Sequence, residues 1–187
     1  MKDRIEKLES KRLYHDSWLE LWVDHFRLDG KERTYSKIKR NDSVVIVPLS
    51  KNGNTVILKH FRFPIESYSY ELPMGGIEHG ETPEVAAERE LLEETGLKCT
   101  SKKLLGKYYA VPGLSAQKVY VFVADIDDTE MSAAETHDRG AEIAEVHVIQ
   151  MSEVQQMVVD GEVTDSFTLS ALTHVFLHRN FCRVKTC

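Results

Sequence analysis

One stretch of 23 residues, 75–97, carries the whole charge imbalance of this chain. The stretch holds seven glutamates and one base, Arg89, and its net charge of −6 equals the formal net charge of all 187 residues. The rest of the chain is therefore neutral. So local a negative charge predicts a site for a cation, and an acidic protein is poorly suited to bind nucleic acid through its phosphates.

The same stretch has clear helix signals at both ends. Thr82 is a typical N-cap residue, and Gly96 is suited to the left-handed position after a helix. At 100° per residue, the three carboxylates of Glu90, Glu93 and Glu94 fall within an arc of ~100° on one helix face. Hard divalent ions such as Mg²⁺ prefer oxygen ligands of this kind. A solvated acidic face is the other interpretation of such a run.

Outside this helix, the pattern is that of an α/β protein. Strands are predicted at 18–28 and 33–40 around an Asp29-Gly30 turn, at 43–49 and 55–58 as a hairpin joined by Asn52-Gly53, and at 103–111, 118–124 and 145–149. Two further helices are expected, at 152–160 and from about 165 to 178. This order predicts a mixed sheet covered on two sides. We expect a small N-terminal β subdomain at 1–41 and a second domain at 42–187.

The chain has the composition of a folded globular protein, with 42% hydrophobic and 29% charged residues. No stretch approaches the ~20 apolar residues needed to span a bilayer, and the first residues alternate in charge where a signal peptide needs an apolar run. The three cysteines are an odd number without metal-finger spacing, which favours reduced thiols. We therefore expect a cytoplasmic protein that does not bind membranes.

The complete spacing within the acidic stretch is more specific than its charge. At every fixed position it resembles the signature of the Nudix hydrolases, with the pattern Gly75-x5-Glu81-x7-Arg89-Glu90-Leu91-x-Glu93-Glu94-x-Gly96-Leu97. The resemblance implies an α/β/α sandwich that hydrolyses a nucleoside diphosphate linked to another group, with Mg²⁺ or Mn²⁺ as the cofactor. It also implies a set of metal ligands, namely Glu90, Glu94, Glu93 and the carbonyl oxygen of Met74. We interpret Arg89 as an orienting partner, because a guanidinium among carboxylates fixes their geometry.

Residues outside the signature resemble the branch of this family that hydrolyses ADP-sugars. Pro112 lies 15 residues beyond Leu97, and its context looks like the substrate loop of that branch, which makes Pro112, Gly113, Leu114 and Ser115 candidate substrate contacts. The segment His60-Phe61-Arg62 is similar to the Gln-Tyr-Arg of the branch, from which only Arg62 is carried over. Arg62 is expected on a phosphate or on the terminal sugar, and a surface arginine at a strand end is the alternative.

Two tryptophans near the N-terminus, Trp18 and Trp22, are candidates for stacking on the base, as N-terminal aromatics do in this branch. Stacking of this kind contributes ~1–3 kcal/mol without selecting the base strongly. Packing in a core or a dimer is the other interpretation of both residues. The resemblance further implies a homodimer formed through the N-terminal strands, which exposed strand edges would make easy.

The resemblance also places a catalytic or metal-binding glutamate in a loop before a late strand. Glu142 and Glu145 are the two candidates, and Glu142 is favoured because Glu145 suits a solvent-facing position in the strand. With Glu93 and Arg89 they form the predicted catalytic set.

The expected activity is metal-dependent hydrolysis of ADP-ribose and related nucleoside diphosphate sugars to a nucleoside monophosphate and a sugar phosphate. A hydrolase that is broad or prefers GDP-mannose is the alternative. A catalytically silent nucleotide-binding module of the same fold is a further class, as is a structural or calcium-binding acidic helix. The unbroken set of glutamates argues against a silent module.

Overall fold

The computed structural model describes residues 5–136 and 141–184, which form two compact units. The first unit comprises Met1–Asp42 and Tyr108–Lys118, and the second comprises Ser43–Lys107 and Val119–Cys187. The first unit therefore contains a loop, 108–118, from far along the sequence in addition to the N-terminal strands.

The first unit is built on an antiparallel sheet of β1 (Ile5–His15), β2 (Glu20–Leu28) and β3 (Lys31–Lys39), in that order. The turn between β2 and β3 is the one that the sequence predicts, because Asp29 (φ 51°) and Gly30 (φ 74°) both adopt the left-handed conformation that a tight hairpin turn needs. The loop 108–118 joins this unit through a hydrogen bond from the Ile38 amide to the carbonyl of Leu114 (2.9 Å).

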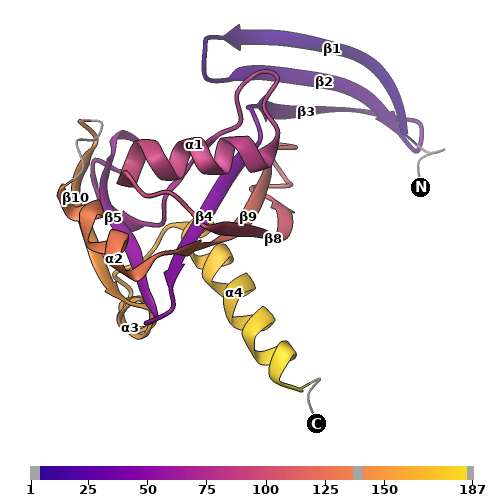
Figure 1. Ribbon diagram of the computed structural model, residues 1–187. Helices are drawn as coiled ribbons and strands as arrows, with labels where there is room; N and C mark the ends of the chain where they lie inside the picture. Colours follow the sequence, from indigo (N-terminus) through magenta and orange to yellow (C-terminus); the bar gives the residue numbers. More distant parts are fainter. Residues whose placement is uncertain (1–4, 137–140, 185–187) are drawn as a thin grey trace. The chain divides into compact units, whose positions relative to one another are not determined.

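The second unit contains two sheets (Figure 1). One has the order β7-β4-β9-β8 and consists of β7 (Met74–Gly76), β4 (Ser43–Ser50), β9 (Lys118–Ile126) and β8 (Ser101–Tyr109). The other has the order β10-β5-β6 and consists of β10 (Ile143–Gln150), β5 (Asn54–Arg62) and β6 (Ser67–Glu71). Because β4 pairs in parallel with β9 and antiparallel with β7, the first of these sheets is mixed, as predicted.

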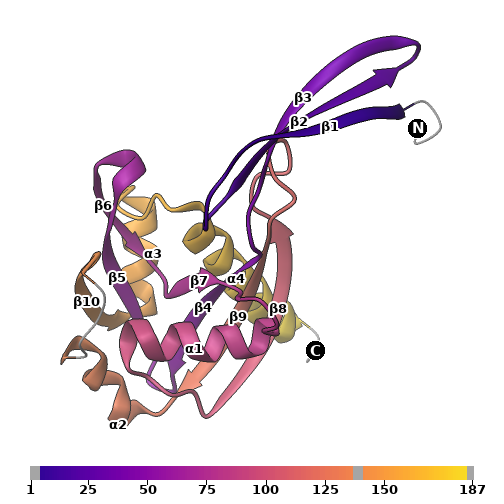
Figure 2. The same cartoon turned by 90° about the horizontal axis from the view of Figure 1, so that it is seen from above.

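Helices cover both sides of the mixed sheet. Figure 2 shows α1 (Pro83–Thr95) and α4 (Ser166–Val184) on opposite sides of β4 and β9. The core between α1 and the strands includes Ala86, Leu91 and Phe122, each with an exposed fraction of 1% or less. The predicted α/β sandwich is thus confirmed. The remaining helical segments are α3 (Met151–Val159), the short α2 (Asp128–Met131) and two 3₁₀ turns, Phe63–Ile65 and Ser132–Thr136.

One sequence prediction is wrong: β4 and β5 do not form a hairpin. The Asn52-Gly53 turn does form, with Gly53 at φ +86°, but its two strands enter different sheets. The carbonyl of Gly53 accepts a hydrogen bond from the Met151 amide (2.9 Å), just after β10, and β5 pairs with β10 along its length. Both strands are buried on both faces, so other parts of the chain must pack against each face. A local turn signal cannot specify which parts these are.

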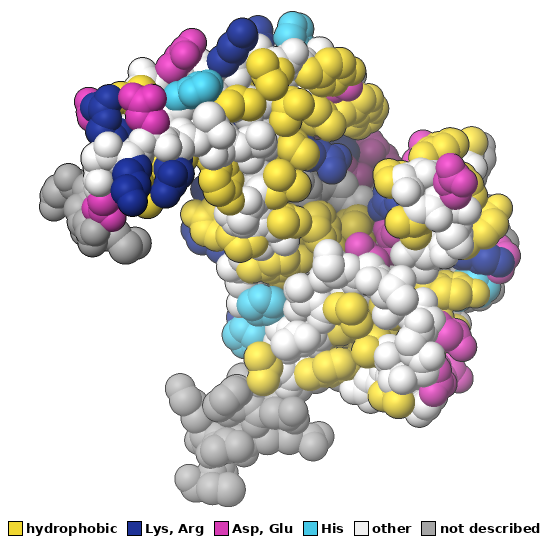
Figure 3. Space-filling model, turned by 180° about the vertical axis from the view of Figure 1, so that it is seen from behind, with side chains coloured by type: hydrophobic (Ala, Val, Ile, Leu, Met, Phe, Trp, Pro, Cys, Tyr) yellow, Lys and Arg dark blue, Asp and Glu magenta, His cyan; other side chains and the backbone are white. Residues whose placement is uncertain are grey.

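Within the described part of the chain, no helix is long and apolar enough to cross a membrane. Figure 3 shows exposed hydrophobic side chains over much of one face, with acidic and basic side chains interspersed among them.

Candidate active site

The acidic stretch folds as a loop followed by α1, with the ends that the sequence predicts. Thr82 accepts a hydrogen bond from the Val85 amide through Oγ1, and Gly96 adopts φ 73° while its amide donates to the carbonyl of Leu92. The apolar stripe that includes Ala86 and Leu91 enters the core. The glutamates therefore occupy the part of the helix surface that the core leaves free.

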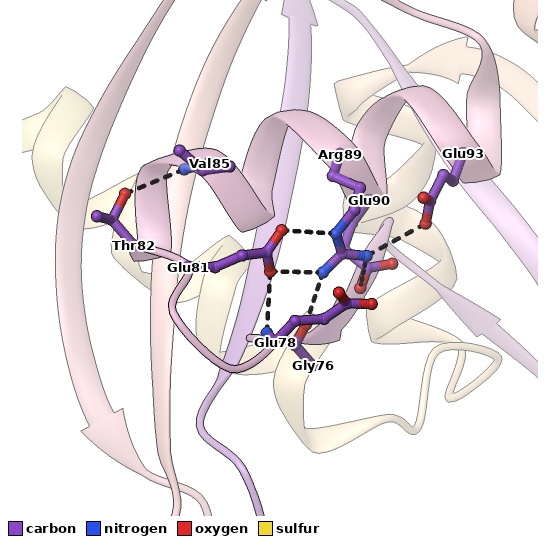
Figure 4. A network of polar contacts seen from close by, with 8 residues as sticks. All are labelled: Gly76, Glu78, Glu81, Thr82, Val85, Arg89, Glu90 and Glu93. Carbon is purple, nitrogen blue, oxygen red and sulfur yellow. Dashed lines mark hydrogen bonds and ion pairs between the residues drawn. The ribbon is translucent and has the colours of Figure 1, made fainter.

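Arg89 is the centre of a polar network that joins the loop to α1 (Figure 4). Its Nε and Nη2 donate to the two carboxylate oxygens of Glu81 at 2.8 and 2.9 Å, and Nη2 also donates to the carbonyl of Gly76 at 2.9 Å. Its Nη1 donates to Glu90 (2.8 Å) and to Glu93 (3.2 Å). Arg89 thus contacts three carboxylates of the acidic stretch at once.

The ionisation of these groups follows from the contacts. The hydrogen bonds from Arg89 and the amide of Glu78 lower the pKa of Glu81 to about 2. Hydrogen bonds to Glu81 in turn raise the pKa of Arg89, so both partners stay charged. The loop and the helix are held together by a permanent ion pair.

Glu90 and Glu94 lie against the short strand β7. A Cβ placed on Gly75 would lie 2.0 Å from Oε1 of Glu90, so only glycine leaves room for this carboxylate. Glu94 accepts a hydrogen bond from the Met74 amide at 2.9 Å. The signature glycine and the residue before it thus contact the two carboxylates that the sequence predicts as the main metal ligands.

Burial makes the charged forms of these two carboxylates unfavourable. Burial raises the pKa of Glu94 to about 8 and raises the pKa of Glu90, against the opposing effect of Arg89. A bound dication would add to the positive charge that Arg89 already supplies to Glu90. Carboxylate and main-chain carbonyl oxygens are the donors that Mg²⁺ and Mn²⁺ prefer.

Within residues 5–136 and 141–184, no three His, Cys, Asp or Glu side chains are gathered closely enough to hold an ion by themselves. Mg²⁺ is usually bound in proteins through one or two carboxylates, with waters and substrate phosphates as the other ligands. Glu90 and Glu94 meet that requirement. Glu93 is more exposed (58%) and contacts Arg89.

Arg62, the predicted substrate contact, lies at the end of β5 and is held by Glu71 of β6. Its Nε lies 3.0 and 3.1 Å from the two carboxylate oxygens of Glu71, and its Nη2 donates to the same carboxylate. Burial opposes the charge on Arg62, yet the hydrogen bonds with Glu71 raise its pKa, with smaller contributions from Asp165 and Glu94. Arg62 is therefore electrostatically linked to the site on α1.

Sequence reasoning did not identify Glu71, which has an exposed fraction of only 3%. The signal was available, because Glu71 is a charged residue just before Leu72 and Pro73 in an otherwise apolar segment. Buried carboxylates of this kind need a partner, and Arg62 is the partner here.

The two candidate loop glutamates have different surroundings. Glu142 lies in the turn before β10, and its Oε2 is 3.2 Å from Nε2 of His60. Glu145 lies within β10 and accepts a hydrogen bond from Nζ of Lys59 at 2.7 Å, which lowers its pKa. His60 is a second residue for which sequence reasoning predicted no role.

The remaining predicted contacts belong to the first unit. Trp18 follows β1 and is 77% exposed, whereas Trp22 on β2 has Nζ of Lys39 4.1 Å from its ring centroid. The loop residues Pro112, Leu114 and Ser115 line a pocket of about 350 Å³ together with residues of β3, and Gly113 accepts a hydrogen bond from the Tyr35 hydroxyl.

Comparison with known proteins gives a consistent result. A model of the NUDIX domain matches residues 39–167. The chain is 32% identical to the ADP-ribose pyrophosphatase of Bacillus subtilis (strain 168) over 183 residues, which cover 95% of this chain and 96% of that protein. It is 25% identical to the GDP-mannose pyrophosphatase of Yersinia enterocolitica, covering 95% and 98% of the two chains. A solved structure described as an ADP compounds hydrolase superimposes with a TM-score of 0.77 at 20% identity, covering 98% of this chain and 96% of that one.

Proposed function

The chain belongs to the NUDIX domain family, and from this premise we propose that it hydrolyses the diphosphate of ADP-ribose and related nucleoside diphosphate sugars. It is a hydrolase that acts on phosphoanhydride bonds. The products would be a nucleoside monophosphate and a sugar phosphate. The observation that carries the proposal is the pair of carboxylates, Glu90 and Glu94, held on one face of α1 against Gly75 and Met74.

A divalent ion is part of this proposal, with Mg²⁺ as the expected ion and Mn²⁺ as a substitute. Glu90 and Glu94 would hold it, Glu93 would share the site, and the carbonyl oxygen of Met74 would be a further ligand. When bound, such an ion neutralises the diphosphate oxygens and lowers the pKa of a bound water. Two carboxylates that would otherwise repel the substrate thereby become part of an anion-binding site.

The protein groups have separate tasks in this scheme. Arg89 holds Glu90 and Glu93 in place through Nη1 while its other nitrogens are bound to Glu81 and Gly76. Arg62 supplies a fixed positive charge for a phosphate or for the terminal sugar, because its guanidinium is already oriented by Glu71.

Glu142 is the group that we assign to take the proton of the attacking water. The side-chain contacts favour it over Glu145, because Glu145 accepts a hydrogen bond from Lys59, while Glu142 contacts His60. Side chains alternate along β5, so Lys59 points away from the face that carries Leu58, His60 and Arg62. Leu58 packs in the core with Ala86 and Leu91, so the face of β5 that carries Leu58 is the one turned toward α1.

Recognition of the rest of the substrate is assigned to the first unit. We propose that Trp18 stacks on the base, and that Pro112, Gly113, Leu114 and Ser115 contact the substrate. Trp22 is a weaker candidate, since its ring is covered by Lys39. A homodimer formed through β1, β2 and β3 is also part of the proposal.

A panel of nucleotide sugars tests the function. ADP-ribose, ADP-glucose, GDP-mannose, UDP-sugars and NADH are incubated with Mg²⁺, and kcat/KM and the products are determined for each. We expect the highest value for ADP-ribose, with AMP and ribose 5-phosphate as products. A preference for GDP-mannose would support the alternative that the Yersinia relative suggests. Absence of hydrolysis with every substrate would overturn the proposal.

A further inference from the structure

His60 of β5 and Glu142, in the turn before β10, form a contact that the mechanism has not yet used. His60 lies near the end of β5, and its side chain is only 10% exposed. Glu142 is 57% exposed, and its Oε2 lies 3.2 Å from Nε2 of His60. The main chain of Glu142 is fixed at the same place, because its carbonyl accepts a hydrogen bond from the Phe61 amide at 2.8 Å.

The direction of this hydrogen bond follows from the chemistry of the two groups. An ionised carboxylate can only accept, so Nε2 of His60 must carry the hydrogen and donate it to Oε2. This holds whether the imidazole is neutral or charged. Oε1 of Glu142 then remains available for a water molecule.

His60 is well suited to hold another side chain still. In the sheet it is flanked by Ile143 of β10 and Ser69 of β6, both buried. A buried ring fixed by the two neighbouring strands loses little further freedom when it makes a contact. A glutamate that is more than half exposed, in contrast, samples many rotamers unless it is tied to a rigid partner.

We propose that His60 is a positioning residue that fixes the carboxylate of Glu142 for catalysis. The inference rests on the proposed function and deepens it. The carboxylate takes a proton from water as the water oxygen bonds to phosphorus and the bond between phosphorus and the bridging oxygen breaks. His60 keeps its own proton and touches neither the water nor the substrate. Its contribution is to hold Glu142 in the one orientation that can accept the proton.

The test is a double-mutant cycle read as kcat and KM with the preferred nucleotide sugar and Mg²⁺. The single variants are His60→Leu, which removes the donor, and Glu142→Gln, which removes the base, and the third variant combines them. His60→Gln restores an N–H donor at the same place. Lys59→Leu is the matched control, because it breaks the neighbouring contact between β5 and β10, with Glu145, on the opposite face.

We expect His60→Leu to lower kcat about tenfold, the effect of releasing one long side chain, with KM changed by less than about twofold. His60→Gln should recover most of that loss, and Lys59→Leu should behave as the wild type. In the Glu142→Gln background, His60→Leu should not lower kcat further, because His60 affects the reaction only through the carboxylate of Glu142.

Two results would overturn the inference: a wild-type kcat for His60→Leu, or an equal loss from His60→Leu in the presence and absence of Glu142. Thermal melting identifies a variant that fails to fold, and His60→Asn, too short to reach Glu142, then replaces His60→Leu. A failure of the proposed function looks different, because the wild-type protein itself would hydrolyse none of the substrates.

Discussion

The carboxylate of Glu90 occupies the space that a side chain on residue 75 would need: a Cβ on Gly75 would lie 2.0 Å from Oε1 and 2.1 Å from Cδ of Glu90. Residues 15 positions apart in the sequence are thereby fitted to each other. Gly75 has no positive φ, so what glycine allows here is the close approach of the Glu90 carboxylate and not an unusual backbone conformation.

Gly75→Ala should therefore displace the carboxylate of Glu90. We expect kcat/KM to fall at least about tenfold and the apparent affinity for Mg²⁺ to weaken, with the fold retained. Gly76→Ala is the control, because a Cβ there meets no atom within 4 Å. Titration of activity with Mg²⁺ measures both effects. If the two variants had the same kcat/KM and the same apparent affinity for Mg²⁺, the close approach of Gly75 and Glu90 would not matter for activity.

Arg89→Lys should separate charge from geometry. Lysine keeps the positive charge but cannot contact Glu81, Gly76, Glu90 and Glu93 together, because it has one nitrogen where arginine has three. We expect kcat to fall about tenfold or more while far-UV circular dichroism stays unchanged. A kcat close to that of the wild type would mean that a point charge is sufficient.

Glu94 should make the metal-free protein less stable as the pH rises. Its pKa of about 8 in the folded protein lies above the unfolded value of ~4.3, so the folded state binds more protons between these values. The stability that comes from the neutral carboxyl is complete below about pH 4 and is lost as the pH approaches 8, by on the order of a few kcal/mol at most.

The measurement compares the wild type with Glu94→Gln in EDTA between pH 5 and 8. Glutamine can still accept the hydrogen bond from the Met74 amide. The Tm of the wild type should fall relative to that of the variant as the pH rises, and saturating Mg²⁺ should raise the Tm of the wild type alone. Parallel Tm curves in EDTA would refute the prediction.

The ion pair of Arg62 and Glu71 should respond unequally to loss of either partner. Glu71 is 3% exposed and Arg62 is 36% exposed at the side chain, so only Arg62 can turn to water when left alone. Arg62→Met should therefore destabilise the protein by about 1–3 kcal/mol more than Glu71→Gln, because it leaves a buried charge without a partner. Urea denaturation of both variants measures the difference, and an equal loss would contradict this account.

Much of this site could be predicted from the sequence because its signals are local. The N-cap at Thr82, the left-handed Gly96 and the shared face of Glu90 and Glu94 each depend on residues within about one or two turns of a helix. Local backbone geometry then determines where they lie. The chemistry of oxygen donors for a hard cation follows from the residue types alone.

The tertiary structure decided which distant residues meet. The sequence could not determine that Glu71 holds Arg62, that His60 contacts Glu142, or that β5 pairs with β10 and not with β4, because these contacts join segments up to 96 positions apart. Such pairings depend on which strands the core brings together. The contacts with β5 also distinguish Glu142 from Glu145, since Glu142 contacts His60 and Glu145 contacts Lys59, whose side chains lie on opposite faces of that strand.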